Sequence, residues 1–141
     1  MAWAHYIERA DITDNVIKIF IDKDEDSLDG YFEETDNYLE DIAQLLGVPT
    51  EDIAVDGTGQ VTPFIVKRFC IVFLCMRVCQ DKASTNNVET SPELDKYYVK
   101  YDLYKKELVE LRKELTPEVL IANVNSIADR ASEQTSYLFR S

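Results

Sequence analysis

Glycine, proline and histidine are scarce in this sequence, and their scarcity excludes several kinds of protein. Four glycines and four prolines among 141 residues are too few for an all-β fold, which depends on many tight turns. The single histidine, His5, leaves a zinc site short of ligands and acid–base catalysis short of a base. A long apolar run is also missing, because charged residues stand at both ends of the most apolar stretch. We therefore expect no zinc site and no membrane-spanning helix.

Basic residues are outnumbered by acidic ones, 15 to 27, which gives a formal net charge of −12. Such a surface repels a phosphate backbone, so sequence-specific binding to nucleic acid is not expected. The same repulsion would suit a protein past which DNA has to move without adhering. With 45% hydrophobic and 30% charged residues, the composition is typical of one globular domain that buries a core.

The three cysteines, Cys70, Cys75 and Cys79, all fall in one predicted helix. One helix does not readily bridge its own cysteines, so we interpret them as reduced thiols in the core of an intracellular protein. The first residues carry neither the basic region nor the apolar region of a secretory signal. We therefore predict that the protein is made in the cytoplasm.

The stretch at about residues 62–82 is predicted to be a central helix. Thr62 and Pro63 suit an N-cap followed by proline at the first helical position. Residues 69–76 are apolar on every side, and a helix without a polar face has to be buried. The fold class that follows is all-α: a small helical bundle around a buried central helix, with a long C-terminal helix and an extended tail.

Two helices are expected before the central one. A short helix covers about residues 13–20, with Thr13 or Asp14 as its cap. A second helix follows an acidic segment and ends at about Leu46, because Gly47 can adopt the C-cap conformation. The apolar residues of the second helix recur at steps of three and four, which predicts one face on the core and an acidic outer face.

The long C-terminal helix is expected to run from about Pro92 to Leu115. Its apolar stripe alternates steps of four and three and consists of Tyr97, Tyr101, Tyr104, Leu108, Leu111 and Leu115. The stripe is too short for a free coiled coil. We favour packing of this stripe on the central helix of the same domain; the alternative is a stripe shared with a neighbouring subunit.

The chain is predicted to divide into a helical domain, residues 1–115, and a C-terminal tail, residues 116–141. The tail is mostly polar but ends with three large apolar residues, Tyr137, Leu138 and Phe139. A polar tail cannot bury such residues by itself. Either the tail is disordered, or its apolar end is an anchor that inserts into a partner.

An acidic segment has the spacing of a calcium-binding loop: Asp22, Asp24 and Asp26 alternate, and Glu33 stands at the twelfth position. Two features disfavour a calcium site. Ser27 occupies the sixth position, where the sharp turn needs glycine, and the sequence has no second loop. We expect a solvated acidic helix start, which the helix dipole favours without an ion, and no bound metal.

No motif indicates catalysis. The turn formed by residues 56–59 lacks the lysine and the context of a phosphate-binding loop. His5 lies in a segment that is expected to be extended, far along the chain from the core cysteines, so no nucleophile has an evident base. We predict a protein that is not an enzyme and that uses no cofactor.

The order of these parts resembles the small head–tail connector proteins of tailed bacteriophages, which are also called neck adaptor or head-completion proteins. The resemblance covers about residues 6–115. It rests on an acidic D-x-D-x-D segment after a short helix, an amphipathic helix containing Tyr38-Leu39, and a loop with Pro63. A Lys/Arg-flanked apolar helix and a final charged helix rich in Tyr and Leu complete the order.

The resemblance implies a helical bundle that forms a ring, expected to be dodecameric, beneath the portal in the virion neck. The C-terminal tail would insert into the portal protein, and the ring's other side would receive a stopper or tail-completion protein. Genomic DNA would pass through the acidic lumen without specific binding, and no membrane would be involved. The residues expected at the portal are Val119, Leu120, Ile121, Tyr137, Leu138 and Phe139. Trp3 and Tyr6 are expected at a neighbouring subunit, since aromatic residues dominate interface energies.

Two other functions stay open. The chain could be a soluble acidic helical module that binds a basic partner, as a DNA mimic or an antitoxin-like regulator does. It could also be an enzyme that holds a divalent ion at Asp24 and Asp26. The first alternative predicts a monomer or dimer that does not assemble with a portal.

Overall fold

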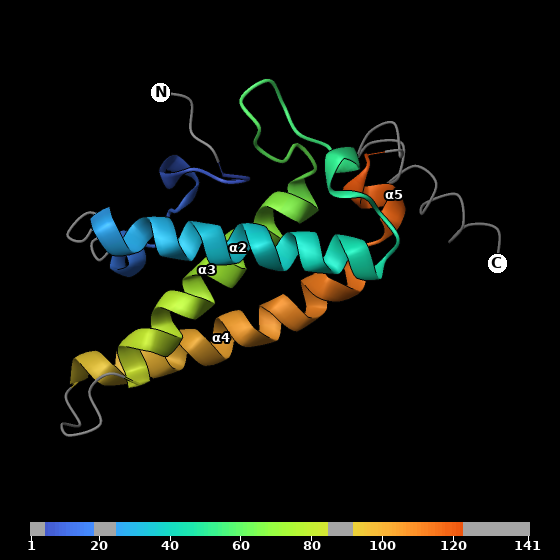
Figure 1. Ribbon diagram of the computed structural model, residues 1–141. Helices are drawn as coiled ribbons and strands as arrows, with labels where there is room; N and C mark the ends of the chain where they lie inside the picture. The colour runs from blue at the N-terminus through green and yellow to red at the C-terminus, as the bar shows by residue number, and fades with distance from the viewer. Residues whose placement is uncertain (1–4, 19–24, 85–91, 123–141) are drawn as a thin grey trace, which may run out of the picture.

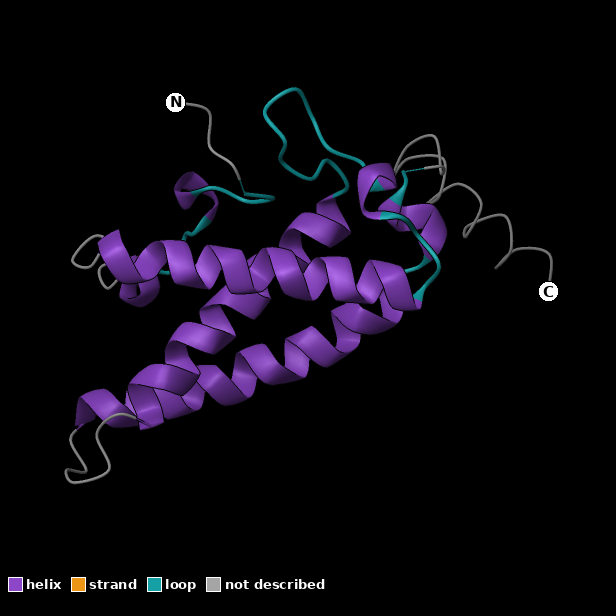
Figure 2. Ribbon diagram, viewed as in Figure 1, coloured by secondary structure: helices purple, strands orange, loops and turns teal. Residues whose placement is uncertain are grey.

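The structure is a computed structural model, and it describes residues 5–18, 25–84 and 92–122, to which all structural statements refer. In chain order the elements are η1 (Arg9–Asp11), α2 (Glu25–Leu45), η2 (Thr50–Asp52), α3 (Phe64–Ser84), α4 (Pro92–Glu114) and α5 (Pro117–Leu120). Residues 15–18 form a further helical turn. Within the described ranges there is no strand, and the only pairing of this kind is an isolated antiparallel bridge between Val55 and Val61 (Figures 1 and 2). The predicted all-α fold class is confirmed.

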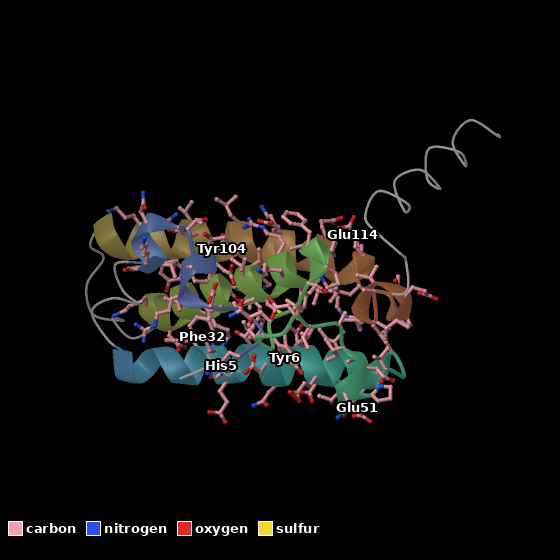
Figure 3. All side chains as sticks on the ribbon, turned by 90° about the horizontal axis from the view of Figure 1, so that it is seen from above. His5, Tyr6, Phe32, Glu51, Tyr104 and Glu114 are labelled. Carbon is pink, nitrogen blue, oxygen red and sulfur yellow. The ribbon has the colours of Figure 1, made fainter. Side chains whose placement is uncertain are left out.

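Helix α3 is the centre of the fold, as its apolar composition predicts. Its buried residues surround the whole helix and are Val66, Phe69, Cys70, Val72, Phe73, Leu74, Cys75, Val78 and Cys79. Helix α2 packs on one side of α3 and α4 on another, so α3 is the middle layer (Figure 3). The helix begins at Phe64, slightly later than predicted, because the first helical hydrogen bond runs from Lys67 N–H to the carbonyl of Pro63, at 3.0 Å.

The apolar stripe of α4 packs within the same chain. Leu108 and Leu115 are buried in the core, and Tyr97, Tyr101, Tyr104 and Leu111 are partly buried against it. Helices α3 and α4 lie side by side along most of their length (Figure 1). The favoured interpretation of the stripe is confirmed, so this face of α4 is already covered.

Helix α2 ends at a glycine C-cap, as predicted. Gly47 has a φ of +78°, which is a conformation that favours glycine. Its N–H donates to the carbonyl of Gln44 at 3.0 Å, and Val48 N–H donates to the carbonyl of Ala43 at 2.8 Å. This pair of bonds is a Schellman motif, and the buried Val48 supplies its apolar contact.

Helix α5 lies beyond residue 115, the predicted domain boundary, and packs on the helical core. Thr116 caps the helix by accepting a hydrogen bond from Val119 N–H at 3.2 Å, and Pro117 is the first helical residue. Val119 and Leu120 are buried in the core, and the carbonyl of Leu120 accepts a hydrogen bond from Ala54 N–H at 2.8 Å. The packed structure therefore continues past residue 115, because a distant loop binds this turn.

Candidate functional site

The acidic segment does not have the geometry of a calcium loop. Asp22 and Asp24 lie outside the described residues, but α2 already begins at Glu25. Asp26 and Glu33 are therefore about two turns apart on a regular helix, whereas a calcium loop would fold both toward one ion. Among the described residues, no group of three or more His, Cys, Asp or Glu side chains is arranged to hold a metal ion.

The three cysteines are core residues, as predicted. Cys70, Cys75 and Cys79 are buried and unbridged. Burial raises the pKa of Cys70, and it raises the pKa values of Cys75 and Cys79 to about 12. These thiols are therefore protonated near neutral pH, and a protonated buried thiol is a poor nucleophile.

The residues predicted to bind a portal fall into three groups. Val119 and Leu120 are buried inside this fold and offer almost no surface to a partner, and their role at a portal stays a prediction. Ile121 is exposed. Tyr137, Leu138 and Phe139 lie outside the described residues.

The N-terminal segment, which contains the residues predicted to contact a neighbouring subunit, packs along α2. Trp3 lies outside the described residues, whereas Tyr6 is half-buried and its hydroxyl donates to Glu40 at 3.4 Å. Asp36 accepts from Tyr6 N–H at 3.0 Å and contacts His5 Nδ1 at 2.6 Å. The ring of His5 stacks on Phe32 with centroids 5.5 Å apart (Figure 3). Tyr6 is thus largely engaged within its own chain.

Burial governs the ionisation of Asp36. The desolvated carboxyl has a raised pKa, although the hydrogen bonds from His5 and from Tyr6 N–H oppose the shift. The carboxylate side chain holds two consecutive residues of the N-terminal segment against α2. It is a structural contact that the sequence did not reveal, because the partners are some thirty positions apart along the chain.

A second carboxylate, Asp14, joins the N-terminal segment to α4. Its Oδ1 accepts from the N–H groups of Val16 at 2.9 Å and Ile17 at 3.4 Å, so Asp14 is the predicted cap of the turn at residues 15–18. Its Oδ2 accepts from Lys100 Nζ at 2.9 Å and from the hydroxyl of Tyr104. Burial pushes the pKa of Asp14 upward, but these hydrogen bonds outweigh it and leave the pKa lowered.

The exterior of α2 carries charge of one sign. Every charged residue of α2 is acidic, and the helix contains Glu25, Asp26, Asp29, Glu33, Glu34, Asp36, Glu40 and Asp41. Arg77 of α3 offsets part of this charge, because its Nε lies 3.0 Å from Glu34 Oε2. Glu33 and Asp41 are exposed on the outer side of the helix. The predicted acidic outer face is therefore present.

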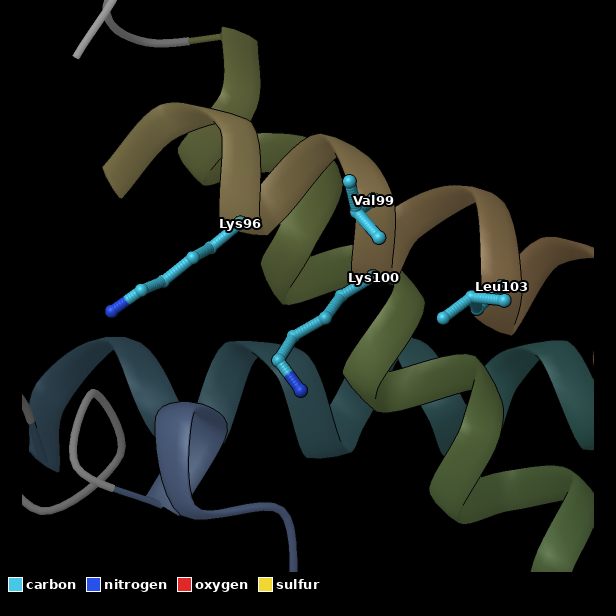
Figure 4. Close-up of a pocket in the computed structure, with 4 residues that line it drawn as sticks. All are labelled: Lys96, Val99, Lys100 and Leu103. Atoms are coloured by element: carbon cyan, nitrogen blue, oxygen red, sulfur yellow. The ribbon is translucent and has the colours of Figure 1, made fainter. Parts of the chain in front are cut away.

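Helix α4 exposes apolar residues on its outer side. Val99 and Leu103 line an open groove together with Lys96 and Lys100, and the four side chains lie along one stretch of the helix (Figure 4). Leu45, at the end of α2, is also exposed. The inner stripe of α4 does not predict this outer groove; the signal in the sequence is the spacing of Val99 and Leu103, which are one helical turn apart.

The described surface thus offers an acidic helix, an apolar groove flanked by lysines and an exposed isoleucine at the end of α5. None of the described helices is both long and apolar enough to cross a membrane. Comparison of the chain with protein-family models, with curated proteins and with solved structures finds no match.

Proposed function

We propose that this protein is a structural, non-enzymatic component of a phage neck. In this proposal, copies of the chain form a ring under the portal, dock on it through the C-terminal tail and link it to the stopper or tail. The proposal rests on the resemblance in the order of the helices, and the all-α fold with a buried central helix agrees with that order.

The observation that carries the proposal is the composition of the sequence that follows Leu120, the last buried residue that the structure describes. Leu120 is buried in the core, and Ile121 is exposed. The sequence then continues to Tyr137, Leu138 and Phe139, large apolar residues at the end of a polar stretch. A tail of this composition suits an anchor that gains burial only in a partner, and we propose the portal as that partner.

The charge of the protein supports passage of DNA through such a ring. A wall with net negative charge repels the phosphate backbone, so DNA would slide through the lumen without adhering. The same charge would weaken association between free copies at low concentration, before they meet the portal. The proposed location is the virion neck, after synthesis in the host cytoplasm.

Mass photometry of the purified full chain mixed with purified portal rings tests the proposal. We expect a complex heavier than the portal ring alone, and we expect it to be lost when residues 137–141 are deleted. Substitution of Ser132 by Ala, in the polar part of the tail, is the matched control and should leave binding unchanged. Both variants should unfold at the wild-type temperature. If the deletion variant binds the portal as well as the full chain does, residues 137–141 are not the anchor. If the full chain does not bind the portal, the portal is not its partner.

A soluble acidic binding module is the second candidate, and the uniformly acidic α2 favours it. A helix that displays carboxylates without basic residues could bind a basic protein in place of nucleic acid. This candidate predicts a monomer or dimer that ignores the portal and binds a basic partner in a salt-dependent manner. The portal experiment therefore separates the two candidates.

A further inference from the structure

The three-layer arrangement makes the outer sides of α2 and α4 face in different directions. Helix α3 lies between them (Figure 3). Tyr38 of α2 stacks on Phe69 and Phe73 of α3, and Leu108 of α4 is buried in the same core. The exposed residues of each helix point away from α3. One copy of the chain therefore cannot bring its own α2 exterior and α4 exterior together, whereas two copies can.

The outer face of α2 is acidic and ends in an apolar side chain. We call Glu33, Asp41 and Leu45 the α2 face. Both carboxylates are exposed, and Leu45 is 80% exposed, the highest value among the large apolar residues of the described chain. Asp41 and Leu45 are four positions apart, so they lie one above the other on the helix.

The outer face of α4 carries two lysines around an apolar pair, with the exposed Asp102 beside it. We call Lys96, Val99, Leu103 and Lys106 the α4 patch; their steps of three, four and three place them along one side of the helix. Val99 is 59% and Leu103 61% exposed, and a lysine stands one turn beyond each end of this apolar pair. Among the described residues, neither Lys96 nor Lys106 forms an ion pair.

We propose that the α4 patch of one copy binds the α2 face of a second copy. Leu45 would enter the apolar groove at Val99 and Leu103. Asp41 lies about 6 Å along its helix from Leu45. Lys96 lies about 4.5 Å along α4 from Val99, and Lys106 the same distance from Leu103, so the carboxylate can reach a lysine when Leu45 occupies the groove. Burial of the apolar residues supplies the attraction, and the ion pairs set the register.

This contact is heterologous, because two different surfaces of the chain meet. A heterologous contact leaves one surface open on each end of a pair, so it propagates and closes into a ring when the rotation between copies allows it. The inference thus rests on the proposed function and names the surfaces by which copies would follow one another in the ring.

Sedimentation velocity on the full chain, at low salt and increasing concentration, tests the contact. We expect concentration-dependent association that Val99→Asp and Leu45→Asp each weaken at least about tenfold, since both place a charge in the apolar contact. Val109→Asp is the matched control, because Val109 is a 53% exposed valine of α4 outside the patch, and it should associate like the wild type. Equal association of the Val99 and Val109 variants, or a wild-type chain that stays monomeric up to about millimolar concentration, would overturn the inference.

Charge reversal tests the identity of the partner surface. Asp41→Lys alone should weaken self-association, and mixing it with a Lys96→Glu, Lys106→Glu variant should restore association between the two variants. Wild-type behaviour of Asp41→Lys, or absence of rescue, would contradict the pairing of α2 with α4. Portal binding of the Val99→Asp variant separates the two proposals: single copies bound to the portal leave the neck function standing, and wild-type rings on the portal overturn only the α2–α4 contact.

Discussion

Asp14 should be among the carboxylates that contribute most to the stability of this fold. Its side chain is largely buried, caps the helical turn at residues 15–18 and binds both Lys100 and Tyr104 of α4. Loss of the cap costs about 1 kcal/mol. Loss of the hydrogen bond from Tyr104 to a charged acceptor costs about 1.5 kcal/mol, and loss of the partly exposed lysine pair about 0.5 kcal/mol. Asp14→Ala should therefore lower the free energy of unfolding by about 3 kcal/mol.

Urea denaturation at pH 7, followed by circular dichroism, measures this change. With a slope of about 2 kcal/mol per molar urea, the midpoint should fall by about 1.5 M. Asp14→Asn keeps an oxygen that can cap the turn, so it should lose only about half as much. A loss below about 0.5 kcal/mol for Asp14→Ala would show that the contacts to α4 do not stabilise the protein.

The pH dependence of the same variant gives a second, independent check. Because the hydrogen bonds lower the pKa of Asp14, its carboxylate contributes stability above its ordinary pKa of 3.8, and this contribution is lost as the pH falls through the lower folded value. The difference in the free energy of unfolding between the wild type and Asp14→Asn should therefore decrease below about pH 4. Asp36→Asn is the control with the opposite pH dependence. Burial raises the pKa of Asp36, so the free energy of unfolding of the wild type should increase relative to that of the variant as the pH falls from 7. The same pH trend in both variants would contradict the account.

Three further predictions concern the cap of α2, an ion pair and the thiols. Gly47→Ala should cost about 1 kcal/mol because Gly47 has a positive φ, whereas Gly57→Ala should cost close to nothing; equal losses in thermal unfolding would exclude the glycine-specific cap. Arg68→Ala should cost about 1 kcal/mol, since Arg68 holds both oxygens of Glu107 at 2.7 and 2.9 Å, while Lys113→Ala, at an exposed pair, should change stability by less than about 0.3 kcal/mol; urea midpoints decide between them. The three buried cysteines should resist iodoacetamide at pH 8 and react after unfolding in urea, as mass spectrometry would show; rapid labelling of the native protein would place them outside the core.

Local sequence signals predicted those parts of the fold that depend on neighbouring residues. The all-apolar run at residues 69–76 identified the buried helix, since no other burial pattern satisfies such a run. Gly47 identified the end of α2 because the C-cap conformation favours glycine. Asp14 was one of two predicted caps, and its role follows from the short reach between its side chain and the next backbone N–H groups.

Contacts between distant positions were beyond the reach of such signals. Val119 and Leu120 were predicted to belong to a tail, because four apolar residues after a proline do not reveal that Ala54 binds them. The acidic segment matched the spacing of a calcium loop, but spacing alone does not show whether residues 25–33 form a loop or a helix. The second role of Asp14, as the acceptor for α4, likewise depends on how the bundle closes.

The most direct test of the account is a cryo-electron microscopy map of a virus particle that contains this chain. The account predicts a ring of copies between the portal and the tail, in which the helices of residues 25–122 fit the density and the segment around Tyr137, Leu138 and Phe139 inserts into the portal. A particle in which the chain is absent from the neck, or lies there with its last residues folded onto its own helices and away from the portal, would contradict it.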